Sequence, residues 1–144
     1  MGKTTWTVRG AATDLLSTEL NSLADEGTAI STSEFDNSSN LDMFCDLELI
    51  LASIDLSAQS NPAIYIWFIN NVSGQEDGSG SVVPARAPDA IIPLREVSAA
   101  QVISVTRLQC PNISFDTVVQ NKTGAALAAS GNTLKIETYG VTTA

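Results

Sequence analysis

The chain has 144 residues, of which 16 are acidic, seven are basic and none is histidine, so its formal net charge is −9. That charge argues against nucleic acid and anionic membranes as partners, because Lys and Arg provide most of the affinity for phosphate groups. Without histidine the chain has no His-based catalytic triad and no imidazole metal ligand. A hydrophobic content of 44% excludes a disordered polyanion, and the length predicts a single domain over residues 1–144.

The composition favours β-structure, because Ser, Thr and Asn together number 39 and prefer strands and turns to long helices. The negative charge is uneven along the chain. Residues 1–72 carry ten acidic and two basic side chains, whereas residues 73–144 carry six and five. Such a surface keeps free copies apart or complements a basic patch on a partner.

The first ten residues lack the apolar run of a secretory signal. Trp6 and Val8 alternate with polar neighbours and predict a short first strand behind a short N-terminal arm. Between residues 14 and 25, leucines recur at helical spacing and predict one or two helical turns. We expect residues 29–36 to be extended and residues 36–40 to turn into the next strand.

The clearest alternation runs over residues 41–51, where apolar residues alternate with mostly acidic ones and predict a long strand with one buried and one wet face. The expected buried face consists of Leu41, Met43, Cys45, Leu47, Leu49 and Leu51. Residues 63–71 are apolar on both faces and predict a central strand covered on both sides. This stretch is too short to span a bilayer.

Glycine and proline mark residues 74–88 as a long exposed loop. Beyond it, residues 90–96 and 101–108 predict a strand pair joined around 97–100, and residues 113–121 predict another strand. Residues 125–131 form either a loop or one helical turn in this interpretation, and residues 133–141 form the last strand. About eight strands without crossover helices predict an all-β, antiparallel two-sheet sandwich that is jelly-roll-like, with an immunoglobulin-like sandwich as the alternative.

The candidates for chemistry are few. Asp42, Asp46 and Glu48 share a strand face and could in principle serve as paired carboxylates, but alternating acids are typical of any solvated strand face. The acidic, glycine-rich residues 76–80 lack the spacing of a calcium loop. We therefore expect no enzyme activity, no catalytic residues, no metal and no cofactor. Cys45 and Cys110 fit no metal spacing and are either two buried thiols or a disulfide.

Three aromatic side chains could stack on a sugar from one face of the sandwich, or pack in the core or against a neighbouring subunit. These are Tyr65, Trp67 and Tyr139, and the first two share one side of their strand. A carbohydrate-binding or adhesin module using Tyr65 and Trp67 is therefore the alternative function.

Several turn and strand-edge segments resemble small virion proteins of tailed bacteriophages. The resemblance lies in residues 20–24, 35–42 and the strand up to Ser53, and in residues 121–124 and 128–135, ending at Tyr139. It implies a capsid decoration, or cement, protein with a jelly-roll-like domain that sits on the outer surface of the capsid. Such a protein is made in the host cytoplasm, is commonly a homotrimer, and stabilises the shell by binding between major capsid protein subunits.

No catalytic residue carries over from this resemblance, and a tail or neck component of the virion is a further alternative. From exposure alone we expect partner contacts in the N-terminal arm and in the 74–88 loop. The candidate interface residues are Trp6, Tyr65, Trp67, Asp77 and Arg86.

Overall fold

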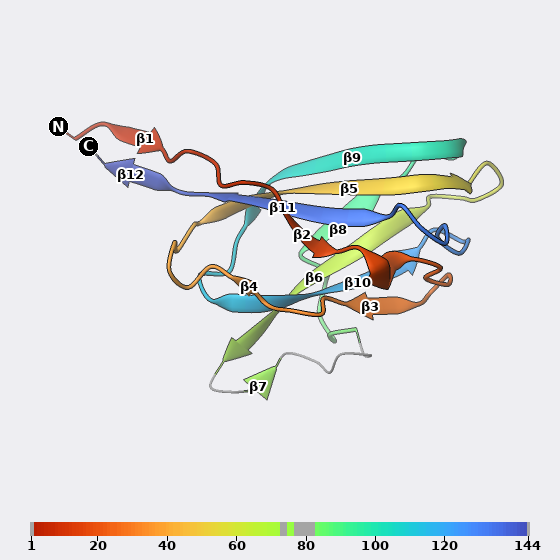
Figure 1. Cartoon of the computed structure of the whole chain (residues 1–144), viewed down its shortest axis with the longest axis horizontal. Coiled ribbons are helices and arrows are strands. Elements are labelled where there is room, and N and C mark those ends of the chain that lie inside the picture. The colour runs from red at the N-terminus through yellow and green to blue at the C-terminus, as the bar shows by residue number, and fades with distance from the viewer. Residues whose placement is uncertain (1, 73–74, 77–82, 144) are drawn as a thin grey trace.

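The structure is a computed structural model and describes residues 2–72, 75–76 and 83–143. In these ranges the chain forms twelve strands and one short 3-10 helix, Thr18–Leu20 (Figure 1). The strands are β1 (Thr4–Trp6), β2 (Thr13–Leu16), β3 (Thr28–Ile30), β4 (Phe35–Asp36), β5 (Phe44–Asp55), β6 (Ala63–Val72), β7 (Gln75–Glu76), β8 (Ala90–Pro93), β9 (Ser98–Gln109), β10 (Ser114–Lys122), β11 (Thr133–Tyr139) and β12 (Val141–Thr143).

Two antiparallel sheets pack face to face, and their strand order is that of a jelly roll. One sheet has the order β2-β11-β5-β9. In the other, β10 and β6 are the central pair, with β3 and β4 beside β10 and β8 and β7 beside β6. If β3 and β4 are taken as one interrupted strand, the first strand of the sandwich, β2, pairs with the last, β11, and the second, β3 with β4, pairs with the next-to-last, β10. This is the jelly-roll pattern. The predicted all-β sandwich is confirmed.

The core lies between β5 and β6, as their sequence patterns predict. Leu47, Leu49 and Leu51 point inward from β5, and Ile64 and Ile66 point inward from β6. On the outer face of β6, Trp67 and Ile69 form a second, smaller buried cluster with Val118 of β10. Both faces of β6 are thus covered, which explains its continuous apolar sequence. Each of the larger side chains contributes roughly 1.5–3 kcal/mol by leaving water.

The predicted pairing of the two strands after the loop is wrong. β8 pairs with β6 in one sheet, and β9 pairs with β5 in the other. The short connection between β8 and β9 therefore crosses from one sheet to the other. The 74–88 segment also differs from a plain loop: β7 pairs with the end of β6, and residues 73–74 and 77–82 lie outside the described residues.

The ends of two other elements also differ from expectation. Only one 3-10 turn forms between residues 14 and 25, because residues 13–16 join the sheet as β2. Leu41 and Met43 are 56% and 54% exposed, since β5 begins only at Phe44. Leu41 has a φ of 51°, and its N–H donates to the carbonyl of Asn37 in a turn that breaks the alternation.

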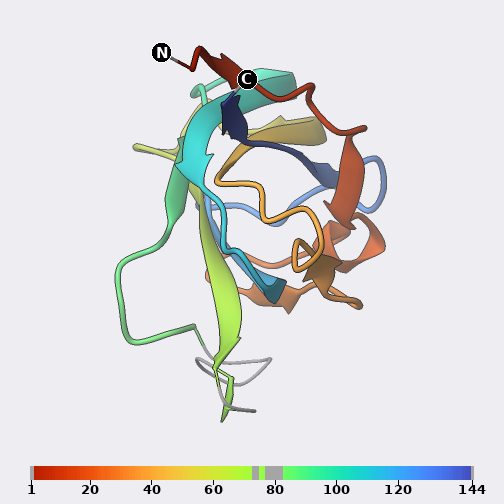
Figure 2. The same cartoon turned by 90° about the vertical axis from the view of Figure 1, so that its left-hand side faces the viewer.

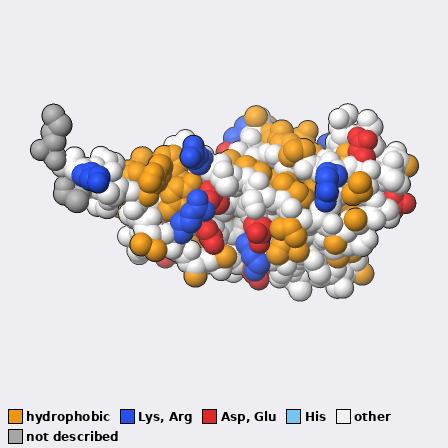
Figure 3. Space-filling view, turned by 90° about the horizontal axis from the view of Figure 1, so that it is seen from above, with side chains coloured by type: hydrophobic (Ala, Val, Ile, Leu, Met, Phe, Trp, Pro, Cys, Tyr) orange, Lys and Arg blue, Asp and Glu red, His pale blue; other side chains and the backbone are white. Residues whose placement is uncertain are grey.

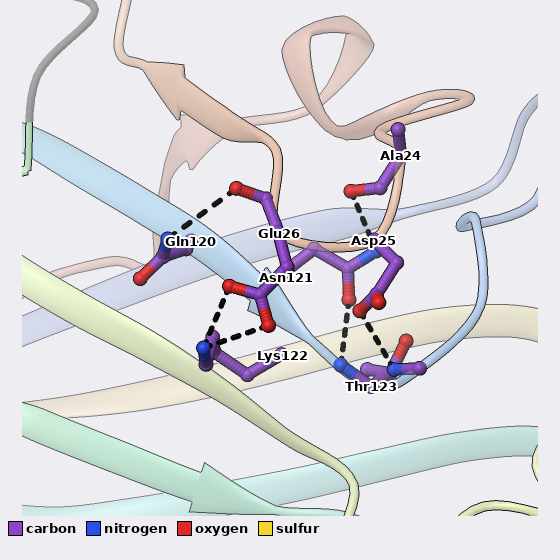
Figure 4. A network of polar contacts seen from close by, with 8 residues as sticks. Ala24, Asp25, Glu26, Gln120, Asn121, Lys122 and Thr123 are labelled. Atoms are coloured by element: carbon purple, nitrogen blue, oxygen red, sulfur yellow. Dashed lines mark hydrogen bonds and ion pairs between the residues drawn. The ribbon is translucent and has the colours of Figure 1, made fainter.

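Buried asparagine side chains hold the loops at both ends of the sandwich. The amide of Asn121 donates to the carbonyls of Leu23, Ala24 and Ala125, and its oxygen accepts the N–H of Thr123. Figure 4 shows the surrounding network, in which Lys122 pairs with Glu26. Asn37 and Asn132, also buried, bond backbone groups of the 41–42 turn and of β5 in the same way. These loops are therefore fixed by side chains and not only by strands.

Candidate functional site

The three acidic side chains singled out on the long strand lie in different surroundings. Asp42 accepts a hydrogen bond from the Thr138 hydroxyl at 2.7 Å. Glu48 lies opposite Lys135 in the β5–β11 ladder. Asp46, expected on the wet face, is instead buried at 7% exposure.

Asp46 is buried because a bulge in β9 brings a backbone donor to it. At the bulge Arg107 has a φ of 61°, and its N–H donates to Asp46 Oδ1 at 2.9 Å. The Tyr139 hydroxyl donates to the same oxygen at 2.9 Å, and Arg9 Nη1 contacts Asp46 Oδ2. The Arg9 guanidinium also lies 4.7 Å from the centre of the Tyr139 ring. Asp46 thus ties the N-terminal segment to both neighbours of β5.

The pKa values in this cluster follow from burial and hydrogen bonding. Burial raises the pKa of Asp46, but the hydrogen bonds from Arg107, Tyr139 and Arg9 outweigh it, so the pKa lies below its usual range. Burial and the neighbouring Asp46 carboxylate raise the pKa of Tyr139. At neutral pH the cluster therefore holds a carboxylate, a guanidinium and a neutral phenol, which is an anchor for the segment that precedes β2.

That segment leads to a projecting two-stranded ribbon, which we call the terminal ribbon: β1, β12 and the residues between them and the sandwich, 7–10 and 140. β1 and β12 pair antiparallel from Thr4 opposite Thr143 to Trp6 opposite Val141. The ribbon extends beyond the end of the sandwich and carries both termini (Figures 1 and 2). The Trp6 ring packs edge-on against Phe44 at 5.6 Å between centroids but stays 61% exposed, and Val8 is 94% exposed. The ribbon offers apolar side chains and strand edges to a partner.

Beside the base of the ribbon lies a cleft of about 940 Å³, which we call the end cleft. It opens between the start of β5, the ends of β6 and β9, and the connection from β9 to β10. Its lining combines apolar and polar groups: Leu41, Met43, Phe44, Phe68, Asn70, Asp89, Arg107, Gln109, Cys110, Pro111, Asn112 and Ile113. Asn70 Oδ1 is buried there without a hydrogen-bond partner among the described residues.

Arg86 and Asp89 cap the strand edge next to this cleft. β8 pairs with β6 only as far as Ile66 and β7 only from Asn71, so residues 67–70 have no strand on that side. Arg86 Nη2 donates to the Phe68 carbonyl at 2.7 Å, and Asp89 Oδ2 accepts the Phe68 N–H at 2.7 Å. Arg86 and Asp89 are themselves an ion pair at 2.9 Å. The pair takes the place of a neighbouring strand and protects the edge from pairing.

Of the two arrangements considered for Tyr65 and Trp67, packing is the one that the structure shows. Trp67 is 3% exposed, because its outer face is covered by the segment after residue 83, and its Nε1 donates to the Arg86 carbonyl at 3.1 Å. Tyr65 lies beside it, half-buried, with the ring centroids 6.2 Å apart. The pair is one packed cluster in this chain and leaves no open stacking surface.

Of the candidate interface residues, Trp6 and Arg86 are exposed, whereas Tyr65 and Trp67 are packed together under Arg86. Asp77 lies outside the described residues. The structure brings Tyr65, Trp67 and Arg86 together and places Trp6 apart from them on the terminal ribbon. Sequence reasoning missed the end cleft and the Asp46 cluster, since a bulge at a non-glycine residue has no local sequence signal.

Cys45 and Cys110 are free, buried thiols, which confirms the first of the two interpretations. The hydrogen bond between them, together with burial, raises the pKa of Cys45. Within the described ranges no group of Cys, Asp and Glu side chains is placed to hold a metal ion. No helix in those ranges is long and apolar enough to cross a membrane.

No protein-family model matches this chain, and no curated protein sequence matches it. A solved structure titled "CBM4 structure and function" is similar to it over 84% of this chain and 80% of that chain, with a TM-score of 0.33 and 7% sequence identity. A TM-score and a sequence identity this low indicate neither a shared fold nor a shared function.

Proposed function

We propose that this chain is a structural protein of a tailed-bacteriophage virion that decorates the outer surface of the capsid. In this proposal it binds between neighbouring major capsid protein subunits, as a homotrimer, and stabilises the shell. It is made in the host cytoplasm and acts mechanically, with no catalytic step and no cofactor. The sequence resemblance to virion proteins supports this function.

The observation that carries the proposal is the terminal ribbon. A rigid sandwich bears a projecting pair of short strands whose Trp6, Val8 and Val141 are 61%, 94% and 39% exposed. Proteins that hold neighbours together by β-augmentation or by packing need such an arm, because unpaired strand edges supply main-chain hydrogen bonds and apolar side chains supply burial. The capped edge at Arg86 and Asp89 leaves the ribbon as the more accessible edge.

The segments behind the resemblance support a structural role as well. Residues 20–24 and 121–124 meet around Asn121, and the 35–42 turn closes around Asn37. Their polar groups bond the protein's own backbone, so these shared features maintain the scaffold that presents the ribbon. A protein that holds a capsid together gains from loops fixed in this way, because a scaffold that is already ordered loses less conformational entropy on binding.

Co-sedimentation with capsids tests the proposal. Purified protein is mixed with expanded heads of the phage that encodes it, from which the protein has been omitted, and with tails as a second target. We expect saturable binding to heads only. Binding to tails alone would indicate a tail component, and retention on a polysaccharide column with no binding to either target would indicate the carbohydrate-binding alternative. Either result would contradict capsid decoration.

A further inference from the structure

The sheet β2-β11-β5-β9 ends in a long strand edge that has no described strand beyond it. β9 pairs with β5 on one side only, and in Figure 1 it forms the upper border of its sheet. The other edge strands of the two sheets are at most four residues long, whereas β9 has twelve residues. A long edge strand presents unpaired N–H and C=O groups to which another extended chain can bind.

Alternate residues of β9 direct their backbone groups away from β5. The carbonyl of Val97 accepts the N–H of Leu56 at 3.2 Å, so Val97 faces β5, and so does every second residue after it. The residues between them face outwards and have exposed side chains: Ser98, Ala100, Val102 and Ser104. Their backbone groups bond no other part of the described chain. The β-bulge at Thr106 and Arg107 ends this regular stretch.

This edge lacks the features by which proteins protect exposed strands. Residues 98–105 contain no charged residue and no proline. The open stretch of β6 at residues 67–70 is different, because Arg86 and Asp89 bond the backbone of Phe68 there. The structure thus closes one strand edge with its own side chains and leaves the longer one open.

The basic residues at the two ends of the open edge have no carboxylate partner. Four of the seven Lys and Arg side chains form ion pairs with acids of the described chain, and the three that do not are Lys3, Arg95 and Arg107. Arg95 precedes β9, Arg107 lies near its end, and both are exposed. Glu96, next to Arg95, accepts the Asn61 N–H at 3.1 Å. Figure 3, which views the molecule from the β9 side, shows basic side chains on this face of a strongly acidic chain.

The same charges argue against a second copy as the occupant. Each chain carries a net charge of −9, so free copies repel one another. Pairing of two β9 edges would also bring Arg95 and Arg107 of both copies to one contact. An extended segment of a different protein, with carboxylates near its ends, complements this edge better.

We infer that the open edge of β9 binds an extended segment of another protein by β-augmentation. The segment is uncharged over the residues that pair with 98–105, and acidic residues at its ends lie beside Arg95 and Arg107. The inference rests on the proposed function for its source, which is a major capsid subunit. It adds a second contact to that of the terminal ribbon, on a different part of the sandwich.

Peptide titrations of isotope-labelled full-length protein, followed by nuclear magnetic resonance, test the edge. The probe is a capped peptide in which threonine and valine alternate over about eight residues, to match residues 98–105, with glutamate at both ends. We expect the largest amide shifts in β9, and binding at least about tenfold tighter than that of the same peptide with lysine ends. A peptide methylated on alternate backbone nitrogens should not bind, because it lacks the N–H groups that pair with the edge.

Two variants separate backbone pairing from charge. Ala100→Pro removes an N–H that faces outwards, so the fold should persist by circular dichroism while peptide binding falls at least about tenfold. Arg107→Glu should remove the preference for glutamate ends. Ile91→Ser is the control, because Ile91 is 48% exposed on β8 in the other sheet, and it should bind like the wild type.

The remaining outcomes decide against the inference or against decoration separately. No binding of either peptide, equal binding of both, or shifts outside β9 would overturn the inference. Dimers of the wild type that Ala100→Pro abolishes would overturn it too, because a second copy would then occupy the edge. If Ala100→Pro sediments with heads as well as the wild type does, decoration stands but the edge does not contact the capsid. Peptide binding by a wild type that ignores heads would contradict decoration and the capsid as the source of the segment.

Discussion

Replacing Asn121 should destabilise the fold more than any surface change, because one side chain holds two loops. Asn121 is fully buried, and its amide donates to the carbonyls of Leu23, Ala24 and Ala125 at 2.9, 3.1 and 2.8 Å. Its oxygen accepts the N–H of Thr123 at 3.0 Å. Asn121→Ala removes these bonds and leaves the buried Thr123 N–H without an acceptor.

The magnitude follows from the bonds that are lost. Each lost hydrogen bond costs about 1 kcal/mol net, and an unsatisfied buried donor costs about 1–3 kcal/mol. Asn121→Ala should therefore lower the free energy of unfolding by about 5 kcal/mol, which corresponds to a fall in Tm of about 15 °C for a chain of this size. Asn121→Asp should cost still more at neutral pH, because it directs a carboxylate at three carbonyl oxygens.

Urea unfolding followed by circular dichroism measures both variants. Asn112→Ala is the control, since Asn112 is exposed and should change stability by less than about 0.5 kcal/mol. If Asn121→Ala is as mild as Asn112→Ala, or if Asn121→Asp is more stable than Asn121→Ala at neutral pH, the hydrogen-bond account of this loop junction is refuted.

Three further predictions concern buried groups. Because the pKa of Asp46 is depressed in the fold, its stabilisation is present above the usual aspartate pKa of about 3.9 and is lost as pH falls through the folded value. Asp46→Asn should thus cost about 2 kcal/mol at pH 7 and flatten the acid side of the stability profile in urea titrations, and an unchanged profile would contradict this. Acrylamide should quench the fluorescence of Trp6 in Trp67→Phe and spare that of Trp67 in Trp6→Phe, and equal quenching would contradict the observed burial. Cys45 and Cys110 should react with a thiol reagent only after unfolding, and rapid labelling of the native protein would argue against this packing.

Much of the fold could be predicted, because the spacing of apolar residues along a strand indicates which of its faces are buried. Alternation over β5 and unbroken apolarity over β6 correctly indicated a half-buried and a fully buried strand. It was harder to predict which strands pair with one another. Sequence neighbours usually form hairpins, but β8 and β9 separate into different sheets, and nothing local in residues 94–97 distinguishes a hairpin turn from a crossing.

The candidate sites depended on contacts between distant segments, which sequence patterns do not reveal. Asp46 is buried through Arg9, Arg107 and Tyr139, which lie 37, 61 and 93 positions away. Trp67 is covered because the chain folds back over the outer face of β6 after residue 83. Trp6 was a candidate interface residue in the strand that follows the N-terminal arm; the structure shows it exposed and adds the neighbouring end cleft.

The most direct test of a decorating role is the strength of the capsid itself. Heads without the protein, heads with wild-type protein restored and heads incubated with a ribbon variant, Trp6→Ser, are heated in the presence of a DNA-binding dye. If the protein stabilises the shell, wild type should raise the temperature of DNA release, and the variant should raise it less. Equal release temperatures for bare heads and for heads shown to carry wild-type protein would contradict a stabilising role.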